Sequence, residues 1–146
     1  MLKNILVPVD GSETSLKALQ FAMEMGKGED SALIVVHVDI PYDLNRLTPK
    51  TKFIGGHPVR VPEAPEAPKP LEMAKKAAAE FGYTNIQFKE LIATDVAERI
   101  CEKAEQMKAD LIVMGNRGFG MITGLFMGSV SMKVSQNSQC PITIVK

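Results

Sequence analysis

Short runs of almost uninterrupted apolar residues constrain the fold of this chain more than any other feature. They occupy Asn4–Val9, Ser31–Asp39 and Leu111–Met114. A strand with one face in water alternates apolar and polar residues, whereas a strand covered on both faces of a parallel sheet does not. Two more strands are expected: an alternating one at Ile86–Ile92, which suits a sheet edge, and a final one at 142–146 after Pro141.

The segments between these runs carry helical signals. Ser12 is placed to cap the first helix, and Asp95 with Glu98 three residues later resembles a capping box. The expected helices cover about 13–25, 71–81, 96–108 and 130–137. Strands and helices thus alternate, and right-handed crossovers place helices on both faces of a parallel sheet. The sequence predicts the α/β class, with one doubly wound, five-stranded domain over residues 1–146.

A proline-rich stretch at about 41–70 interrupts this pattern, because seven of the nine prolines lie there. Such a composition favours an extended connection, and thirty residues is long for a loop within a compact domain. We interpret it as an insertion loop, with a short helical turn expected within 42–53. It is either a variable surface insertion or a lid or partner-binding segment.

Composition narrows the classes of partner. The formal net charge is zero, so neither a nucleic-acid footprint nor a basic membrane-binding surface is expected. No apolar run approaches the length of a bilayer span. The chain starts without the apolar core of a signal peptide, so a cytoplasmic location is expected. Cys101 and Cys140 lack metal-site spacing and are interpreted as free thiols.

Polar and glycine-rich features follow the ends of three predicted strands. Asp10 follows the first strand, Val38 lies near the end of the second, and residues 115–129 hold five of the eleven glycines. Ligands of parallel sheets bind where the strands' carboxyl ends meet, and a glycine-rich loop before a helix suits phosphate. The Walker A and dinucleotide-binding glycine patterns are both missing, so the motif is of another kind.

The glycines have the spacing Gly115-x2-Gly118-x9-Gly128-Ser129. Together with Val7–Ser12, His37-Val38, Asp110–Gly115 and Cys140–Val145, this pattern resembles the ATP-binding members of the universal stress protein family. The resemblance covers the whole chain apart from the proline-rich stretch. It implies a Rossmann-like strand order 3-2-1-4-5, ATP with Mg or Mn as ligand, a regulatory or stress-response role, and a homodimer formed through strand 142–145. Protein partners stay unknown.

The same resemblance implies which residues contact the nucleotide. Asp10 would lie near the ribose or, through water, near metal and phosphates, while Pro8 and Val38 would border the adenine. Main-chain groups of 115–121 and 128–131 would hold ribose and phosphates. The predicted site residues are Pro8, Asp10, Val38, Gly115, Asn116, Arg117, Gly118, Phe119, Gly120, Met121, Gly128, Ser129, Val130 and Ser131.

Several of these residues have structural alternatives. Asp10 could be only an Asx-turn residue before Ser12, and Ser131 could be an ordinary residue of the helix surface. Gly118, Gly120 and Gly124 could merely allow a tight turn. The apolar residues within 119–127 favour a subunit contact over a ligand contact.

No catalytic residue and no protein metal ligand are assigned. His37 and His57 are the only histidines, and neither has an evident partner for general-base chemistry, so an enzyme is not expected and at most slow ATP hydrolysis would occur. The main alternative is a nucleotide-free dimeric adaptor of the same family. An enzyme of another doubly wound family, such as an ATP pyrophosphatase, is disfavoured because Val9–Ser12 lacks the required loop.

Overall fold

The computed structural model describes residues 1–40, 51–60, 69–118 and 127–146. Its main sheet has five parallel strands in the order β5-β2-β1-β6-β7. Along the chain these strands are β1 (Asn4–Pro8), β2 (Ala32–Asp39), β5 (Ile86–Ile92), β6 (Leu111–Gly115) and β7 (Ile142–Val145). Numbered as members of this sheet, they have the order 3-2-1-4-5, which confirms the predicted fold.

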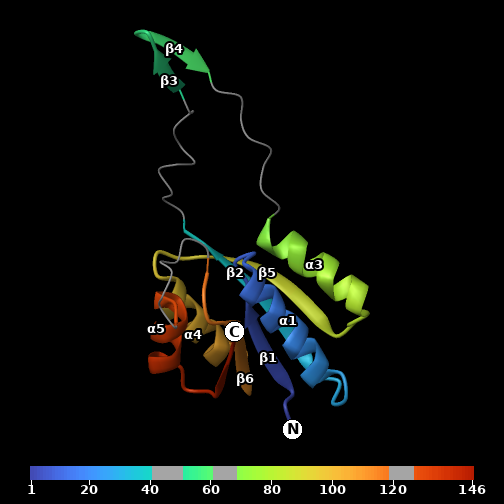
Figure 1. Cartoon of the computed structure of the whole chain (residues 1–146). Helices are drawn as coiled ribbons and strands as arrows, with labels where there is room; N and C mark the ends of the chain where they lie inside the picture. The colour runs from blue at the N-terminus through green and yellow to red at the C-terminus, as the bar shows by residue number, and fades with distance from the viewer. Residues whose placement is uncertain (41–50, 61–68, 119–126) are drawn as a thin grey trace.

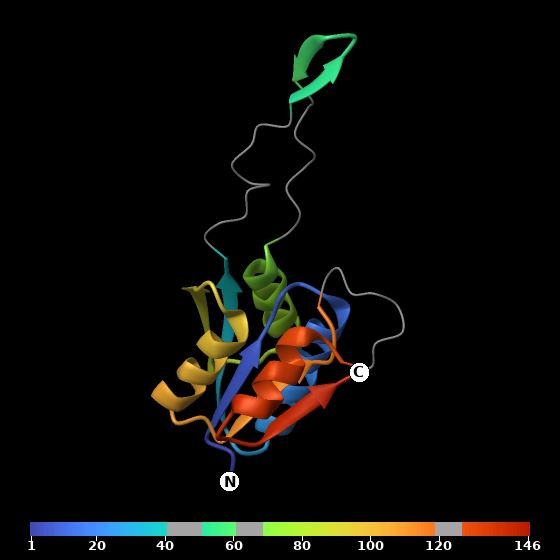
Figure 2. The same cartoon turned by 90° about the vertical axis from the view of Figure 1, so that its left-hand side faces the viewer.

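Helices cover both faces of the sheet (Figures 1 and 2). On one face lie α1 (Glu13–Gly26) and α3 (Pro70–Phe81), and on the other lie α4 (Val96–Gln106) and α5 (Ser129–Asn137). The expected helix starts are confirmed at two caps. Ser12 Oγ accepts the Ser15 N–H at 3.4 Å, and Asp95 Oδ1 accepts the Glu98 N–H at 3.0 Å.

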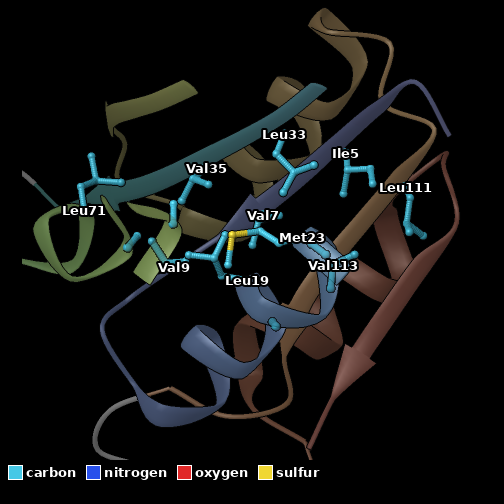
Figure 3. Close-up of a cluster of buried hydrophobic side chains, with 14 residues drawn as sticks. Ile5, Val7, Val9, Leu19, Met23, Leu33, Val35, Leu71, Leu111 and Val113 are labelled. Atoms are coloured by element: carbon cyan, nitrogen blue, oxygen red, sulfur yellow. The ribbon is translucent and has the colours of Figure 1, made fainter. Parts of the chain in front are cut away.

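The core has two halves because the central strands are buried on both sides. On the α1 and α3 side, Val7 and Val35 pack with Leu19 and Met23 of α1 (Figure 3). The other half joins strand residues to α4 and α5, and its fully buried members include Leu6, Val36, Ile100, Ile112 and Val134. Burial on both faces is the reason that these strand sequences do not alternate. Cys101 and Cys140 are free, as predicted.

A second, two-stranded sheet corrects the interpretation of the proline-rich stretch. Strands β3 (Thr51–Ile54) and β4 (His57–Arg60) pair antiparallel, joined by Gly55 and Gly56 at φ 61° and 80°. Two left-handed glycines match a tight hairpin turn, a signal that the neighbouring prolines obscured. The helical turn expected within 42–53 is therefore wrong at 51–53, and its remainder, 42–50, lies outside the described residues.

Among the described residues, no helix combines the length and the apolar character needed to cross a membrane.

Candidate functional site

A cavity of about 290 Å³ opens at the carboxyl edge of the main sheet. Its walls come from the ends of β1, β2 and β6 and from the first turns of α4 and α5, so the fold brings together segments far apart in sequence. The lining residues are Pro8, Val9, Asp10, Ser15, Val36, His37, Val38, Val96, Ile100, Met114, Gly115, Arg117, Gly118, Gly128, Ser129, Val130 and Ser131. This is the edge at which the sequence predicts a ligand.

Most of the predicted site residues lie on this cavity wall. Asn116 is buried, 5% exposed, and its main-chain carbonyl accepts the N–H of Gly128, which lines the cavity. Phe119, Gly120 and Met121 fall outside the described residues, as does the subunit contact predicted for 119–127, apart from its last residue. The predicted residues that line the cavity are Pro8, Asp10, Val38, Gly115, Arg117, Gly118, Gly128, Ser129, Val130 and Ser131.

Asp10 forms a turn and also lines the cavity. Its Oδ1 accepts hydrogen bonds from the Ser12 N–H at 2.9 Å and from Ser12 Oγ at 2.5 Å. These are the bonds of the Asx-turn alternative. The other carboxylate oxygen faces Gly118, where a Cβ atom would lie 2.4 Å from Oδ2. The turn therefore fixes the Asp10 carboxylate at the cavity wall, and the two interpretations of this residue are compatible.

Gly115 is required by packing between β6 and the start of α1. A Cβ atom at this position would lie 2.8 Å from the Thr14 carbonyl carbon and 2.9 Å from the Ser15 nitrogen. Thr14 Oγ1 also donates to the Arg117 carbonyl at 2.7 Å, which ties the segment after β6 to α1. The first glycine of the motif thus has a structural role whether or not a ligand is bound.

The N-terminus of α5 faces the cavity without a side-chain cap. Its N-cap residue, Gly128, donates its N–H to the Asn116 carbonyl at 2.6 Å. Ser131 Oγ lies 3.1 Å from that same carbonyl and 3.1 Å from the Gly128 carbonyl. Because Ser131 is 3% exposed, its interpretation as a helix-surface residue is wrong. The positive end of the α5 dipole is directed at the cavity, which favours an anion.

One wall of the cavity is apolar. It is formed by Val36 and Val38 of β2, Val96 and Ile100 of α4, and Met114 of β6. Of these five, the sequence interpretation identified Val38 alone. Residues two apart on a strand share a face, so Val38 could have indicated Val36. The α4 residues could have been found from the predicted helix start, which follows β5 at the same sheet edge.

Val9, Ser15 and His37 also line the cavity and were missed. The His37 ring is oriented by one hydrogen bond: Nδ1 lies 2.9 Å from the Val9 carbonyl, so its N–H donates there, and Nε2 lies 3.8 Å from Glu90 Oε1, beyond hydrogen-bond distance. These contacts agree with the structural role expected for His37 near a strand end.

Formal charge is sparse around the cavity. Among the described lining residues, Arg117 is the one permanent cation and Asp10 the one carboxylate. Beside the cavity, Lys133 of α5 forms an ion pair with Asp95, the N-cap of α4. The hydrogen bond from Lys133, followed by the Glu98 N–H, lowers the pKa of Asp95, and the same ion pair raises the pKa of Lys133. This ion pair joins the two helices that line the cavity.

The donor set fits a divalent cation only if the ligand contributes oxygens. The described residues contain no group of three or more His, Cys, Asp or Glu side chains placed to hold a metal ion. Mg²⁺ commonly binds to one or two carboxylates together with substrate phosphates and water. Asp10 could supply the protein's share of such a site.

Known proteins resemble this chain over its full length. A sequence model of the universal stress protein family matches residues 1–146. Universal stress protein YxiE of Bacillus subtilis is 35% identical over 152 residues, with all of both chains covered. Universal stress protein MJ0531 of Methanocaldococcus jannaschii is 32% identical, with 100% of this chain and 83% of that protein covered.

Solved structures of known proteins also share the fold of this chain. A universal stress protein in complex with cAMP has a TM-score of 0.68 and 25% identity, with 99% of this chain and 96% of that chain covered. The protein from Archaeoglobus fulgidus in complex with dAMP has a TM-score of 0.67 and 20% identity, with 100% and 98% covered. With the whole-chain family match and relatives above 30% identity, the chain belongs to the universal stress protein family, as the resemblance of its sequence predicted.

Proposed function

We propose that this protein binds an adenine nucleotide in the cavity at the carboxyl edge of the sheet, with ATP among its ligands. It would act in the cytoplasm as a dimeric regulatory protein of a stress response. One observation carries the proposal: an apolar wall, an uncapped helix N-terminus and a cationic side chain surround a single cavity of about 290 Å³. Apolar clefts with few, well-placed polar groups are typical of small-molecule sites.

Each part of a nucleotide has a matching part of the cavity. The apolar residues Val36, Val38 and Ile100 suit a flat base, and the first turn of α5 suits phosphate oxygens. Asp10 also lines the cavity, where its carboxylate could accept a ribose hydroxyl. The complex of a related protein with cAMP supports an adenine nucleotide as the class of ligand. Arg117 would add a charge-assisted contact to phosphate.

A divalent cation would bind together with the phosphates. Mg²⁺ or Mn²⁺, held by Asp10 and by phosphate oxygens, would neutralise part of the triphosphate charge. Asp10 is suited to this role because both hydrogen bonds from Ser12 converge on Oδ1 and orient the carboxylate.

We propose binding without rapid turnover. Among the described lining residues, His37 is the one histidine, and its Nδ1–H is bound to the Val9 carbonyl. Fast phosphoryl transfer needs a residue that positions the attacking water and several groups that stabilise the transferred phosphate. Arg117 and Asp10 alone would support slow hydrolysis at most.

The dimer would form through β7, the edge strand of the main sheet. Residues 142–145 are all half-buried, and β7 pairs with β6 on one side. An unpaired apolar edge promotes association, and a two-fold axis lets two identical edges cover each other. Adding a charge with Thr143→Lys should therefore weaken the dimer, which sedimentation velocity would measure.

Calorimetric titration tests the nucleotide proposal. Wild-type protein is titrated with ATP and AMP in excess magnesium chloride, beside Gly118→Val and the control Gly28→Val. We expect saturable binding to wild type and control, and weak binding to Gly118→Val, because Gly118 lies against Asp10, whereas a Cβ atom at Gly28 would meet nothing within 4 Å. A folded wild-type dimer that binds neither nucleotide would contradict the proposal and favour the nucleotide-free adaptor. Equal binding by Gly118→Val would place the site elsewhere.

A further inference from the structure

The described residues at the α5 end of the cavity supply little positive charge for a triphosphate. Arg117 and Asp10 cancel formally, since they are the one permanent cation and the one carboxylate among the described lining residues. Residues 119–126, which read Phe-Gly-Met-Ile-Thr-Gly-Leu-Phe, contain no charged side chain, so they add no charge wherever they lie. The N-terminus of α5 contributes about half an elementary charge.

Lys133 is already engaged in an ion pair. It lies on α5 two residues after Ser131, but its ammonium group is paired with the Asp95 carboxylate. This ion pair also joins α4 to α5, so releasing Lys133 toward a ligand would break a contact between two helices that line the cavity. Among the described residues that line the cavity, the charge available to phosphates is therefore that of Arg117 and the α5 N-terminus, reduced by Asp10.

We infer that this cavity selects among adenine nucleotides by phosphate charge, binding AMP or a cyclic monophosphate without metal but ATP only as its complex with a divalent cation. The inference rests on the proposed function and specifies its ligand class. ATP carries the largest negative charge of these ligands, and the cyclic monophosphate the smallest. Charge taken out of water without compensation is strongly unfavourable, so the uncompensated part of the triphosphate charge weakens binding.

Asp10 is the residue that sets the dependence on metal. Its carboxylate repels a bare triphosphate, and the two hydrogen bonds from Ser12 hold it in place so that it cannot simply turn away. A divalent cation reverses the sign of this interaction, because Asp10 and phosphate oxygens then bind the same ion. A monophosphate has less charge to neutralise and can be held by Arg117 and α5.

Calorimetric titration in excess magnesium and in excess EDTA tests this inference. We expect the Kd of AMP and of cyclic AMP to change less than about twofold between the two conditions, whereas removal of magnesium raises the Kd of ATP roughly tenfold or more. Metal-free ATP that binds as tightly as AMP would overturn the inference and leave the proposed function intact. Absence of binding by all three nucleotides would overturn both.

Two charge variants assign the effect to this site. Asp10→Asn should lower the Kd of metal-free ATP and so reduce the difference in the Kd of ATP with and without magnesium. Ser129→Lys should lower the Kd of metal-free ATP more than the Kd of cyclic AMP. Glu80→Gln makes the same change in net charge as Asp10→Asn, but on an exposed residue of α3 away from the cavity, so it should leave the magnesium effect unchanged. An equal change in Glu80→Gln would attribute the effect to overall charge and contradict the role of Asp10.

Discussion

Gly118 lies against the Asp10 carboxylate, so close that a Cβ atom at Gly118 would be 2.4 Å from Asp10 Oδ2. The two residues are far apart in sequence. They meet because Asp10 follows β1, Gly118 follows β6, and these two strands are neighbours in the sheet. Because Asp10 Oδ1 is held by Ser12, the carboxylate can move aside only by giving up these hydrogen bonds. The glycine motif and the turn after β1 are therefore one structural unit.

Replacing Gly118 should disturb this unit even without a ligand. Gly118→Ala should lower the free energy of unfolding by about 1 kcal/mol, since the displaced Asp10 loses hydrogen bonds to Ser12. In an Asp10→Ala background the same substitution should have a smaller effect, because the clash is already removed. Urea denaturation of the two single variants and the double variant measures the coupling. Additive effects would show that Gly118 and Asp10 do not interact.

Gly115→Ala should destabilise the fold more than Gly118→Ala. The new Cβ atom would meet main-chain atoms of Thr14 and Ser15 at the start of α1, which cannot rotate away as a side chain can. Overpacking of this kind typically lowers the free energy of unfolding by about 1–3 kcal/mol. Gly28→Ala is the matched control, with an effect within about 0.5 kcal/mol, as for ordinary surface changes. A thermal or urea midpoint equal to wild type for Gly115→Ala would contradict the packing role.

The Asp95–Lys133 ion pair should stabilise the protein over a bounded pH range. Because the folded-state pKa of Asp95 is lowered, its contribution is present above the unfolded pKa of about 3.9 and is lost as pH falls through the folded value. Because the pKa of Lys133 is raised, its contribution is present below about 10.4 and is lost as pH rises through the folded value.

Asp95→Asn keeps a capping side chain but removes the charge. Relative to wild type, it should lower the urea midpoint at neutral pH, and the difference should shrink toward both ends of the pH range. Lys133→Met should give the same profile, and combining the two changes should add little. A difference that does not vary with pH would mean that the variant acts through the cap and not through the ion pair.

The hairpin β3–β4 should depend on its two glycines. Gly56→Val places a β-branched residue at φ 80°, a conformation that L side chains rarely adopt, and should abolish cross-strand NMR contacts between Lys52 and Val59. Gly56→Asn should retain them, because Asn tolerates the left-handed region. The thermal midpoint of the main sheet should not change, since among the described strands β3 and β4 pair with each other and with no strand of that sheet. A large drop would show that the hairpin supports the main fold.

The main sheet could be predicted from sequence because local and global signals agree. Val7 and Val35 face one half of the core while Leu6 and Val36 face the other, so both faces of each strand had to be apolar. The starts of α1 and α4 could also be predicted, because Ser12 and Asp95 are residue types that commonly cap helices, and their side chains do cap these two. The hairpin at 51–60 was missed because a Gly-Gly turn is a two-residue signal, and the proline content around it favoured an extended chain.

The cavity could be predicted only in part. The spacing of the glycines indicated which residues the segment after β6 and the start of α5 contribute to the cavity. It gave no indication that Val96 and Ile100 of α4 also line the cavity, because they reach it through tertiary packing. Nor could sequence separate the two roles of Asp10, because an Asx turn and a ligand contact use the same residue type. Packing at Gly115 was also hidden, since the Thr14 and Ser15 atoms that exclude a side chain lie far away in sequence.

The carbonyl of Asn116 accepts both the Gly128 N–H and the Ser131 hydroxyl, so the two ends of the segment between β6 and α5 are fastened to one another. Because the two ends are fastened and loop-closure entropy rises slowly with length, residues can be added between them at little entropic cost. The length of the chain between Asn116 and Gly128 can therefore change while the contact that joins the end of β6 to the start of α5 is kept.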